Sequence, residues 1–238
     1  SLDALAAEAQ GIAAVIGFPE KREGPGRPCF NALAFCRDGK VQAIARKCLL
    51  PAYDVFAEPR YFEPAAEPTL VDLAGTRIAL TICEDLWNDK GFWQHQAYPQ
   101  DPVAESVRRG ARLIINASAS PFWQGKGELR ERMISAVAKR HGVPVLYANQ
   151  AGGDDELVYD GRSLAFDGTG RLAARGAAFA EDFLVVEMKD GSVQGTLAPA
   201  PADETEAVYR ALVLGVRDYV TKCGFRSVVL GLSGGIDS

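Results

Sequence analysis

The stretch of the chain that decides the fold lies at residues 77–87, which read RIALTICEDLW. The first six of these residues have the apolar character of a buried strand, and the strand ends on Cys83. Two carboxylates and a tryptophan follow at once. In α/β folds, strand ends often hold reactive side chains, because a rigid strand aims them into a cleft. A thiol there can attack a carbonyl carbon, although cysteine is also among the most buried residue types and a plain core position is the alternative.

Strand and helix patterns alternate on both sides of this stretch. In chain order, we expect a helix over 2–10, strands over 11–18, 29–36 and 40–47, a proline-rich functional loop over 49–70, a strand over 77–83, a helix over 101–110, a strand over 111–118, a helix over 127–141, and strands over 143–150, 157–166, 171–176 and 183–188. Strands that alternate with helices indicate a sheet with helices outside, and the hairpins add antiparallel edges. The pattern therefore predicts an α/β layered sandwich with mixed sheets.

The last fifty residues have a different organisation. Residues 190–205 lose periodicity and read as a linker, and 206–224 then have apolar residues at helical spacing. A strand over 227–232 leads into a glycine-rich loop, which normally requires a following helix to complete an anion site. We therefore expect a piece of a longer protein, cut at both ends, with a first domain over 1–189, a linker over 190–205 and the beginning of a second domain over 206–238.

Composition excludes several classes of protein. The chain has 238 residues, of which 47% are hydrophobic and 24% charged, as in an ordinary globular protein with a core. A net charge of −5 gives no indication of binding to nucleic acid or to an anionic membrane surface. No apolar stretch approaches the roughly 20 residues of a membrane span, and the first residues lack the features of a signal peptide. We expect a cytoplasmic protein with neither nucleic acid nor membrane as a partner.

Five cysteines are scattered without CxxC spacing, which favours reduced thiols over a disulfide framework or a zinc site. The chain has two histidines, His95 and His141, so a histidine-rich metal centre is not expected. A cysteine–histidine pair is also not expected, although one histidine would suffice for it.

Two further segments have the residue types of a reactive site. Lys47 lies at the end of a strand, and a lysine near a cysteine lowers the pKa of the thiol and stabilises an oxyanion; the alternative is a solvated surface lysine. Residues 116–130, NASASPFWQGKGELR, place small polar residues after a strand, where hydroxyls and amides can bind an amide or a carboxylate. Lys126 suits a carboxylate, and the alternative is a solvated lysine near a helix N-terminus. The three tryptophans (Trp87, Trp93 and Trp123) are expected to be core or interface aromatics.

These motifs resemble one family. RKCLLPAYDVFAEPRYF at 46–62, followed by TICEDLW at 81–87, closely resembles the nitrilase (carbon–nitrogen hydrolase) superfamily. More narrowly, it is similar to the glutaminase domain of glutamine-dependent NAD synthetases. NQAGGDDELVYDG at 149–161 is rather specific to that branch, and SGGIDS at 233–238 resembles the ATP loop of amidotransferase synthetases. The resemblance implies a nitrilase-like α-β-β-α sandwich, followed by the first helix and strand of a Rossmann-like ATP-pyrophosphatase domain.

The resemblance also implies roles for residues around the cysteine. Cys83 would be the nucleophile that forms a thioester with glutamine, and Lys47 would hold the oxyanion. The backbone N–H of Glu84 would be a second oxyanion donor, and Glu58 would support the lysine. A carboxylate must take the thiol proton, since a free cysteine is mostly protonated at neutral pH.

The glutamine itself would be contacted by Tyr53, Ser120 and Lys126, with Glu84 at the same site. Glu20 is a tempting candidate for the base, but the turn that follows it is a hairpin where the family has a helix. We therefore expect the triad glutamate to lie upstream of residue 1.

For the second domain, the resemblance implies an ATP site with Mg²⁺ held by Asp237, whereas the glutaminase domain needs no cofactor. The residues expected to hold ATP are Gly231, Leu232, Ser233, Gly234, Gly235, Ile236, Asp237 and Ser238. The implied reaction is hydrolysis of L-glutamine coupled to ATP-dependent amidation of deamido-NAD to NAD, in an enzyme that forms a homo-oligomer.

Two other functions stay open. One is a stand-alone amidase or carbamoylase of the nitrilase superfamily, against which SGGIDS argues. The other is a scaffold, because the 238 residues by themselves are expected to have little or no glutaminase activity.

Overall fold

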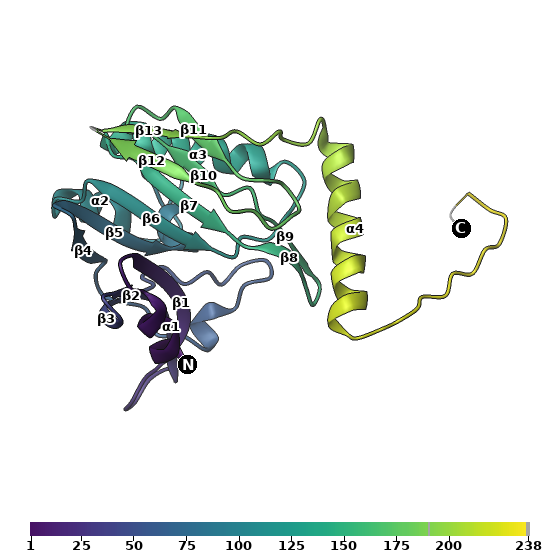
Figure 1. The fold of residues 1–238 in the computed structure, drawn as a ribbon, viewed down its shortest axis with the longest axis horizontal. Helices are drawn as coiled ribbons and strands as arrows, with labels where there is room; N and C mark the ends of the chain where they lie inside the picture. The colour runs from purple at the N-terminus through teal and green to yellow at the C-terminus, as the bar shows by residue number, and fades with distance from the viewer. Residues whose placement is uncertain (190, 237–238) are drawn as a thin grey trace.

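A six-stranded sheet forms the centre of the computed structural model, which describes residues 1–189 and 191–236 (Figure 1). Its strand order is β11-β10-β7-β6-β5-β4. The three middle strands run parallel and are β5 (Thr76–Ile82), β6 (Leu113–Ser118) and β7 (Val145–Asn149). The antiparallel outer strands are β4 (Thr69–Leu73), β10 (Leu164–Phe166) and β11 (Leu172–Arg175). The carboxyl ends of the three parallel strands thus meet at one edge.

A second, antiparallel sheet packs on one face of the first. It contains β1 (Ala13–Lys21), β2 (Cys29–Arg37) and β3 (Lys40–Arg46), in that order. Side chains alternate along β2, so Leu33 and Phe35 pack with residues of β5 such as Ile78. Ala34 and Cys36 point the other way, against Ala6 of α1 (Leu2–Glu8).

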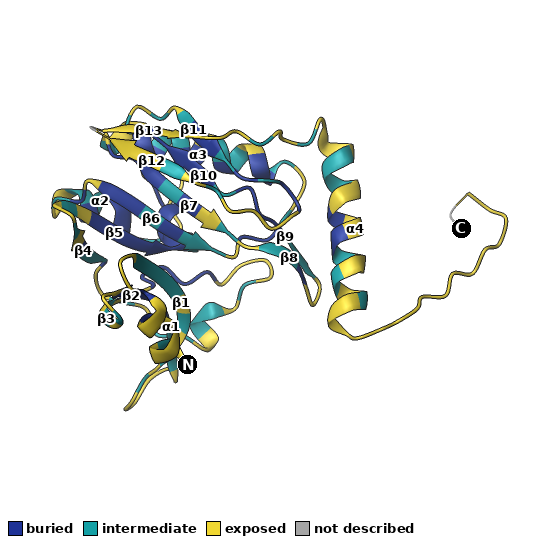
Figure 2. Cartoon of the chain, viewed as in Figure 1, coloured by how far each residue is buried: buried dark blue, intermediate teal, exposed yellow. Residues whose placement is uncertain are grey.

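The other face of the central sheet is covered by α2 (Pro102–Arg108) and α3 (Lys126–His141). Ile114 of β6 and Val145 of β7 are fully buried against Ile134 and Val137 of α3. The layers therefore run helix, sheet, sheet, helix. The strands of the central sheet contain many of the buried residues (Figure 2). The expected α-β-β-α sandwich is confirmed. None of the helices in the described ranges is both long and apolar enough to cross a bilayer.

Two hairpins and a long helix are further elements of the described residues. β8 (Ala151–Asp154) and β9 (Leu157–Asp160) form one hairpin, and β12 (Val186–Lys189) and β13 (Ser192–Gly195) form another. The long helix α4 (Glu204–Lys222) lies beside the β8–β9 hairpin, and the chain beyond it extends away from the body (Figure 1).

The structure differs from the sequence-based expectation in several places, and β4 and β8 have no counterpart among the expected strands. Part of the expected linker forms β13, because Val193 is buried against Ala165 and Ala174. The expected strand over 227–232 is not formed; a strand requires a partner for its hydrogen bonds, and Val229 is 98% exposed. The single strand expected over 157–166 is split into β9 and β10, which belong to different sheets.

Candidate active site

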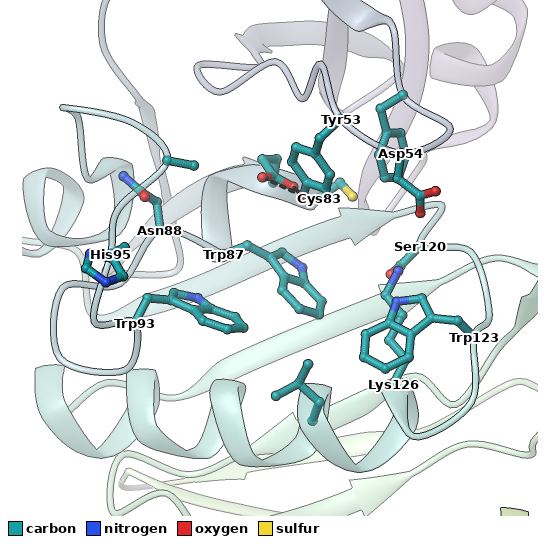
Figure 3. A pocket seen from close by; sticks show the side chains of 14 residues that line it. Tyr53, Asp54, Cys83, Trp87, Asn88, Trp93, His95, Ser120, Trp123 and Lys126 are labelled. Atoms are coloured by element: carbon teal, nitrogen blue, oxygen red, sulfur yellow. Dashed lines mark hydrogen bonds between the residues drawn. The ribbon is translucent and has the colours of Figure 1, made fainter.

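The ends of the central strands open into a cavity of about 300 Å³. Side chains from the proline-rich loop, from the end of β5 and from the start of α3 all point into it (Figure 3). Of the residues expected at the site, the cavity is lined by Tyr53, Cys83, Glu84, Ser120 and Lys126. The fold thus gathers residues that are up to 73 positions apart in the sequence, between Tyr53 and Lys126.

Cys83 lies directly after β5 and begins a short 3-10 helix, η2 (Cys83–Leu86). Its φ of 43° is a left-handed conformation that a non-glycine residue rarely adopts. Such strained backbone is often found at functional sites. Burial raises the pKa of the Cys83 thiol, the positive charge of Lys47 lowers it, and the negative charge of Glu84 raises it. The thiol is therefore protonated at neutral pH until a base removes its proton.

Lys47 is a buried neighbour of this thiol and not a solvated surface lysine. Its side chain is 1% exposed, and Nζ donates to Glu58 Oε1 at 2.5 Å. Glu58 begins the 3-10 helix η1 (Glu58–Arg60) of the proline-rich loop. Its second oxygen, Oε2, is buried and has no hydrogen-bond partner within the described residues. The Lys47 ammonium is thus buried and paired with the Glu58 carboxylate, and its positive charge acts on the sulfur of Cys83.

A buried carboxylate that the sequence did not single out joins these two segments. Asp85 Oδ1 accepts hydrogen bonds from the backbone N–H groups of Cys48 at 3.0 Å and Leu49 at 2.8 Å. Its Oδ2 accepts from Ile82 N at 3.0 Å. Asp85 therefore fixes the residues that follow Lys47 to the turn that carries Cys83. The sequence signal was present, as a carboxylate two residues after the cysteine, but its partners are distant in the chain.

The side chain of Glu84 binds two tyrosines. Tyr53 Oη donates to both carboxylate oxygens at 2.9 Å, and Tyr98 Oη lies 3.2 Å from Oε1. Burial raises the pKa of Glu84. Burial also raises the pKa of Tyr53 and of Tyr98, and the negative charge of Glu84 raises both further. Glu84 was expected at this site from the sequence, whereas Tyr98 was not.

Ser120 and Lys126 form another wall of the cavity. Ser120 is buried, and its backbone N–H donates to Asn149 Oδ1 at 2.9 Å. Lys126 is also buried, and its ammonium lies 5.6 Å from the ring centre of Trp87 and 6.0 Å from that of Trp123. Burial lowers the pKa of Lys126, and the negative charge of a Cys83 thiolate raises it. A cation in this setting can bind a carboxylate strongly.

All three tryptophans line the cavity, whereas they were expected to be core or interface aromatics. Trp87 and Trp93 stack with ring centres 6.3 Å apart and also pack against the core. His95 lines the cavity as well, but Figure 3 shows it beyond Trp93 and away from Cys83. Glu20 lies on β1 with its carboxylate on Arg46, at 2.5 and 2.7 Å, and does not line this cavity.

The segment expected to bind ATP lies away from this cavity. Residues 231–236 are exposed, and the N–H of Gly235 lies 3.3 Å from Ser233 Oγ. Asp237 and Ser238 lie outside the described residues. Within the described ranges, no group of three or more histidine, cysteine, aspartate or glutamate side chains is arranged to hold a metal ion. The described residues therefore do not form a Mg²⁺ site by themselves.

Comparison with known proteins agrees with the geometry. The chain matches the Carbon-nitrogen hydrolase family over residues 2–196 and the NAD synthase family over residues 208–238. It is 43% identical over 221 residues to a Glutamine-dependent NAD(+) synthetase of Synechocystis sp., covering 92% of this chain and 39% of that protein. The chain thus spans about two fifths of the length of this relative.

Solved structures give the same picture. The fold is similar to that of a glutamine-dependent NAD+ synthetase from Acinetobacter baumannii in complex with ADP, with a TM-score of 0.89 and 30% identity. The similarity covers 99% of this chain and 43% of that one. A mutant amidase from Nesterenkonia sp. AN1, which shows Michael addition of acrylamide at its active-site cysteine, has a TM-score of 0.59 and 25% identity, covering 74% of this chain and 63% of that one.

Proposed function

Because the chain belongs to the carbon–nitrogen hydrolase family, we propose that the complete protein hydrolyses the side-chain amide of glutamine through a thioester on Cys83. The observation that carries this proposal is that Cys83 lines the cavity while the buried charge of Lys47, behind the cavity lining, acts on its thiol. A carboxylate base takes the thiol proton, because burial raises the pKa of Cys83. The thiolate then attacks the amide carbon.

The remaining steps follow from the charges at the site. Attack moves the carbonyl electrons to oxygen, and the Lys47 ammonium, held by Glu58, stabilises the oxyanion together with the backbone N–H of Glu84. The base returns the proton that it took from Cys83 to the amide nitrogen, and collapse of the tetrahedral adduct then breaks the C–N bond and releases ammonia. Water then attacks the thioester, which releases glutamate and restores the Cys83 thiol.

The shape of the cavity suits a small amino acid. We assign the α-carboxylate of glutamine to Lys126, with Ser120 and Tyr53 as further contacts. Two acidic residues line the cavity, Asp54 and Glu84, and we assign the α-ammonium to the carboxylate of Glu84. A substrate with charges at one end and an amide at the other would thus meet a matching group at each end.

For the complete protein, we propose a glutamine-dependent NAD synthetase. Relatives of that name support this assignment, as does the NAD synthase match that begins at residue 208. Residues 1–189 would be the glutaminase domain, 190–205 would connect it, and 206–238 would begin the synthetase domain. Ammonia from the first domain would amidate deamido-NAD at the expense of ATP. Residues 231–238 would bind the ATP pyrophosphate, with Asp237 on Mg²⁺, while a homo-oligomer and a cytoplasmic location stay predictions.

Two assays on the full-length protein test the proposal. Ammonia release from glutamine is expected in the wild type and absent in Cys83→Ala, whereas Cys223→Ala retains it. Mass spectrometry is expected to find a glutamyl adduct on Cys83 when the reaction is quenched with acid. Equal ammonia release from the wild type and Cys83→Ala excludes the mechanism. Formation of NAD that depends on both ATP and deamido-NAD separates the synthetase from a stand-alone amidase.

A further inference from the structure

Helix α4 lies within the region that matches NAD synthase for most of its length, yet it packs against the body that matches the hydrolase. One face of α4 is buried: Leu214 is 3% exposed, whereas Leu212, two residues earlier, is 64% exposed. In Figure 1, α4 stands next to β8 and β9. The helix is therefore an element of the first domain's surface as well as the start of the next region.

The buried face of α4 contacts the loop that leads to the cavity wall. Ala211 and Leu214 form a cluster with Phe179, against which Phe122 packs. The rings of Phe122 and Phe179 meet edge to face, 5.2 Å apart. At the N-terminal end of α4, Glu204 accepts a hydrogen bond from the side chain of Gln124 at 2.5 Å. Phe122 and Gln124 lie between Ser120 and Lys126 in the sequence.

The C-terminal half of α4 is fastened to the β8–β9 hairpin. Gly153 lies so near the helix that a Cβ added to it would be 3.0 Å from Gly215 Cα. The backbone N–H of Gly153 donates to Asp218 Oδ2 at 2.7 Å, and Lys222 Nζ donates to the carbonyl of Gly153 at 2.5 Å. Glycine is needed for this close approach, which gives a physical role to the GG of the segment NQAGGDDELVYDG.

The hairpin in turn holds the same loop from its other side. The backbone N–H of Phe122 donates to the carbonyl of Val158 at 2.6 Å, and Pro121 forms a β-bridge with Tyr159. The loop over 119–125 is thus enclosed by α4 and β9. It carries Ser120 and Trp123 and leads directly into Lys126, all of which line the cavity.

We propose that α4 is a positioning element of the glutamine site: it holds the 119–125 loop so that Ser120 and Lys126 face the substrate. The inference rests on the proposed glutaminase function. Cys83 and Lys47 come from other segments, held together through Asp85. Loosening α4 therefore weakens the binding of glutamine without changing the intrinsic reactivity of the thiol. The region that matches NAD synthase would in this way support one wall of the cavity from outside.

The test compares two leucines of α4 in the full-length protein. Leu214→Ala removes packing on the buried face, and Leu212→Ala makes the same change on the exposed face. For Leu214→Ala we expect the KM for glutamine to rise about tenfold or more, with a smaller change in kcat. The rate at which iodoacetamide alkylates Cys83 is expected to stay at the wild-type value, since this reagent has no carboxylate for Lys126. Leu212→Ala is expected to keep the wild-type KM.

A second variant, Asp218→Asn, removes the negative charge of the side chain that accepts the hydrogen bond from Gly153 N–H, and it leaves the apolar core unchanged. It is also expected to raise the KM for glutamine. Hydrogen exchange of residues 119–126 is expected to be faster in both variants. Wild-type KM and wild-type exchange in Leu214→Ala and Asp218→Asn would overturn the role of α4. If the wild type releases no ammonia from glutamine, the proposed function fails, and the exchange rates still decide whether α4 holds the loop.

Discussion

Lys47 and Glu58 form a contact whose value lies in chemistry more than in stability. A buried ion pair loses the hydration of both partners, so it contributes little to folding compared with apolar side chains of similar volume. Here it keeps a positive charge in a low-dielectric site where the charge acts on Cys83. A charge fixed in advance at the position of an oxyanion stabilises a transition state without reorganisation.

Replacing Glu58 tests this interpretation. Glu58→Gln keeps the size of the side chain but leaves the buried ammonium of Lys47 without a counter-charge. We expect kcat for ammonia release from glutamine to fall on the order of 10²-fold, with little change in KM. Glu67→Gln is the matched control, because the Glu67 side chain belongs to the same loop and is 74% exposed. A Glu58→Gln variant with wild-type kcat would contradict the role of the pair.

The raised pKa of Asp85 makes the free energy of unfolding depend on pH. Burial raises the pKa of this carboxyl from 3.8 to about 6, and the hydrogen bonds from Ile82 and Leu49 oppose the shift. Between these values the folded protein binds the proton more tightly than the unfolded chain does, so this group's contribution to stability falls as pH rises. Relative to Asp85→Asn, the wild type is expected to lose up to about 3 kcal/mol of unfolding free energy between about pH 4 and pH 6.

Urea unfolding of both proteins at intervals from about pH 4 to pH 7 measures this difference. Above the pKa of Asp85 the difference is expected to become constant, because the carboxyl is then ionised in both states. A difference that is the same at every pH would show that the pKa of Asp85 is not shifted by folding, and a difference that moves in the opposite direction would show that folding lowers it.

At the scale of elements, a buried ion pair joins α3 to the end of β9. Arg130 donates to both oxygens of Asp160, at 3.1 and 2.6 Å, and both side chains are buried. Asn149, at the end of β7, also donates to Asp160 and to Gly161 O. Through these bonds, the end of β7 and the β8–β9 hairpin are held against the helix that begins with Lys126.

Breaking this junction is expected to be costly. Asp160→Ala leaves the Arg130 guanidinium buried without its partner, so we expect a loss of about 3–5 kcal/mol in the free energy of unfolding. Asp72→Ala breaks the exposed pair between Asp72 and Arg77 and is expected to cost less than about 1 kcal/mol. Chemical denaturation of the two variants measures both losses in the free energy of unfolding. Equal losses would mean that burial of the Arg130–Asp160 pair does not determine its contribution to stability.

At the scale of the whole molecule, the layers determine which thiols can react. Cys36 lies under α1 and Cys48 lies beside Asp85; both are buried, and burial raises the pKa of each thiol, to about 12 for Cys48. Cys223 follows α4 and is exposed. Cys83 reaches the cavity, which admits small molecules.

Labelling followed by mass spectrometry is expected to reflect this arrangement. In the native protein, a bulky maleimide should modify Cys223 and leave Cys36 and Cys48 unmodified until the protein unfolds. Iodoacetamide, which is smaller, should also modify Cys83, and glutamine should protect that residue alone. Modification of Cys36 at the rate of Cys223, or a failure of glutamine to protect Cys83, would contradict the described layers or the assigned site.

The sequence predicted much of the fold because strand and helix periodicity is local. The apolar residues of 29–36, the alternation in 40–47 and the apolar run before Cys83 predicted β2, β3 and β5 nearly as they are, whereas the edge strand β4 was not expected. The expectation failed where pairing decides the structure. Residues 192–195 have no clear pattern but become a strand beside β12, and 227–232 have a strand pattern but lack a neighbour. Hydrogen bonds between strands depend on which segments meet in space, and periodicity does not report this.

By itself, the sequence determined that Cys83 lies at the end of a buried strand, that Lys47 and Glu58 precede it in motifs of one order, and that the chain resembles one family. The tertiary structure alone decided that Asp85 joins the two halves of the site, that Tyr98 shares Glu84 with Tyr53, and that the tryptophans line the cavity. The physical reason is that a buried polar group must find a partner wherever the chain brings one. These partners come from segments far apart in the sequence, so only the packed layers specify them.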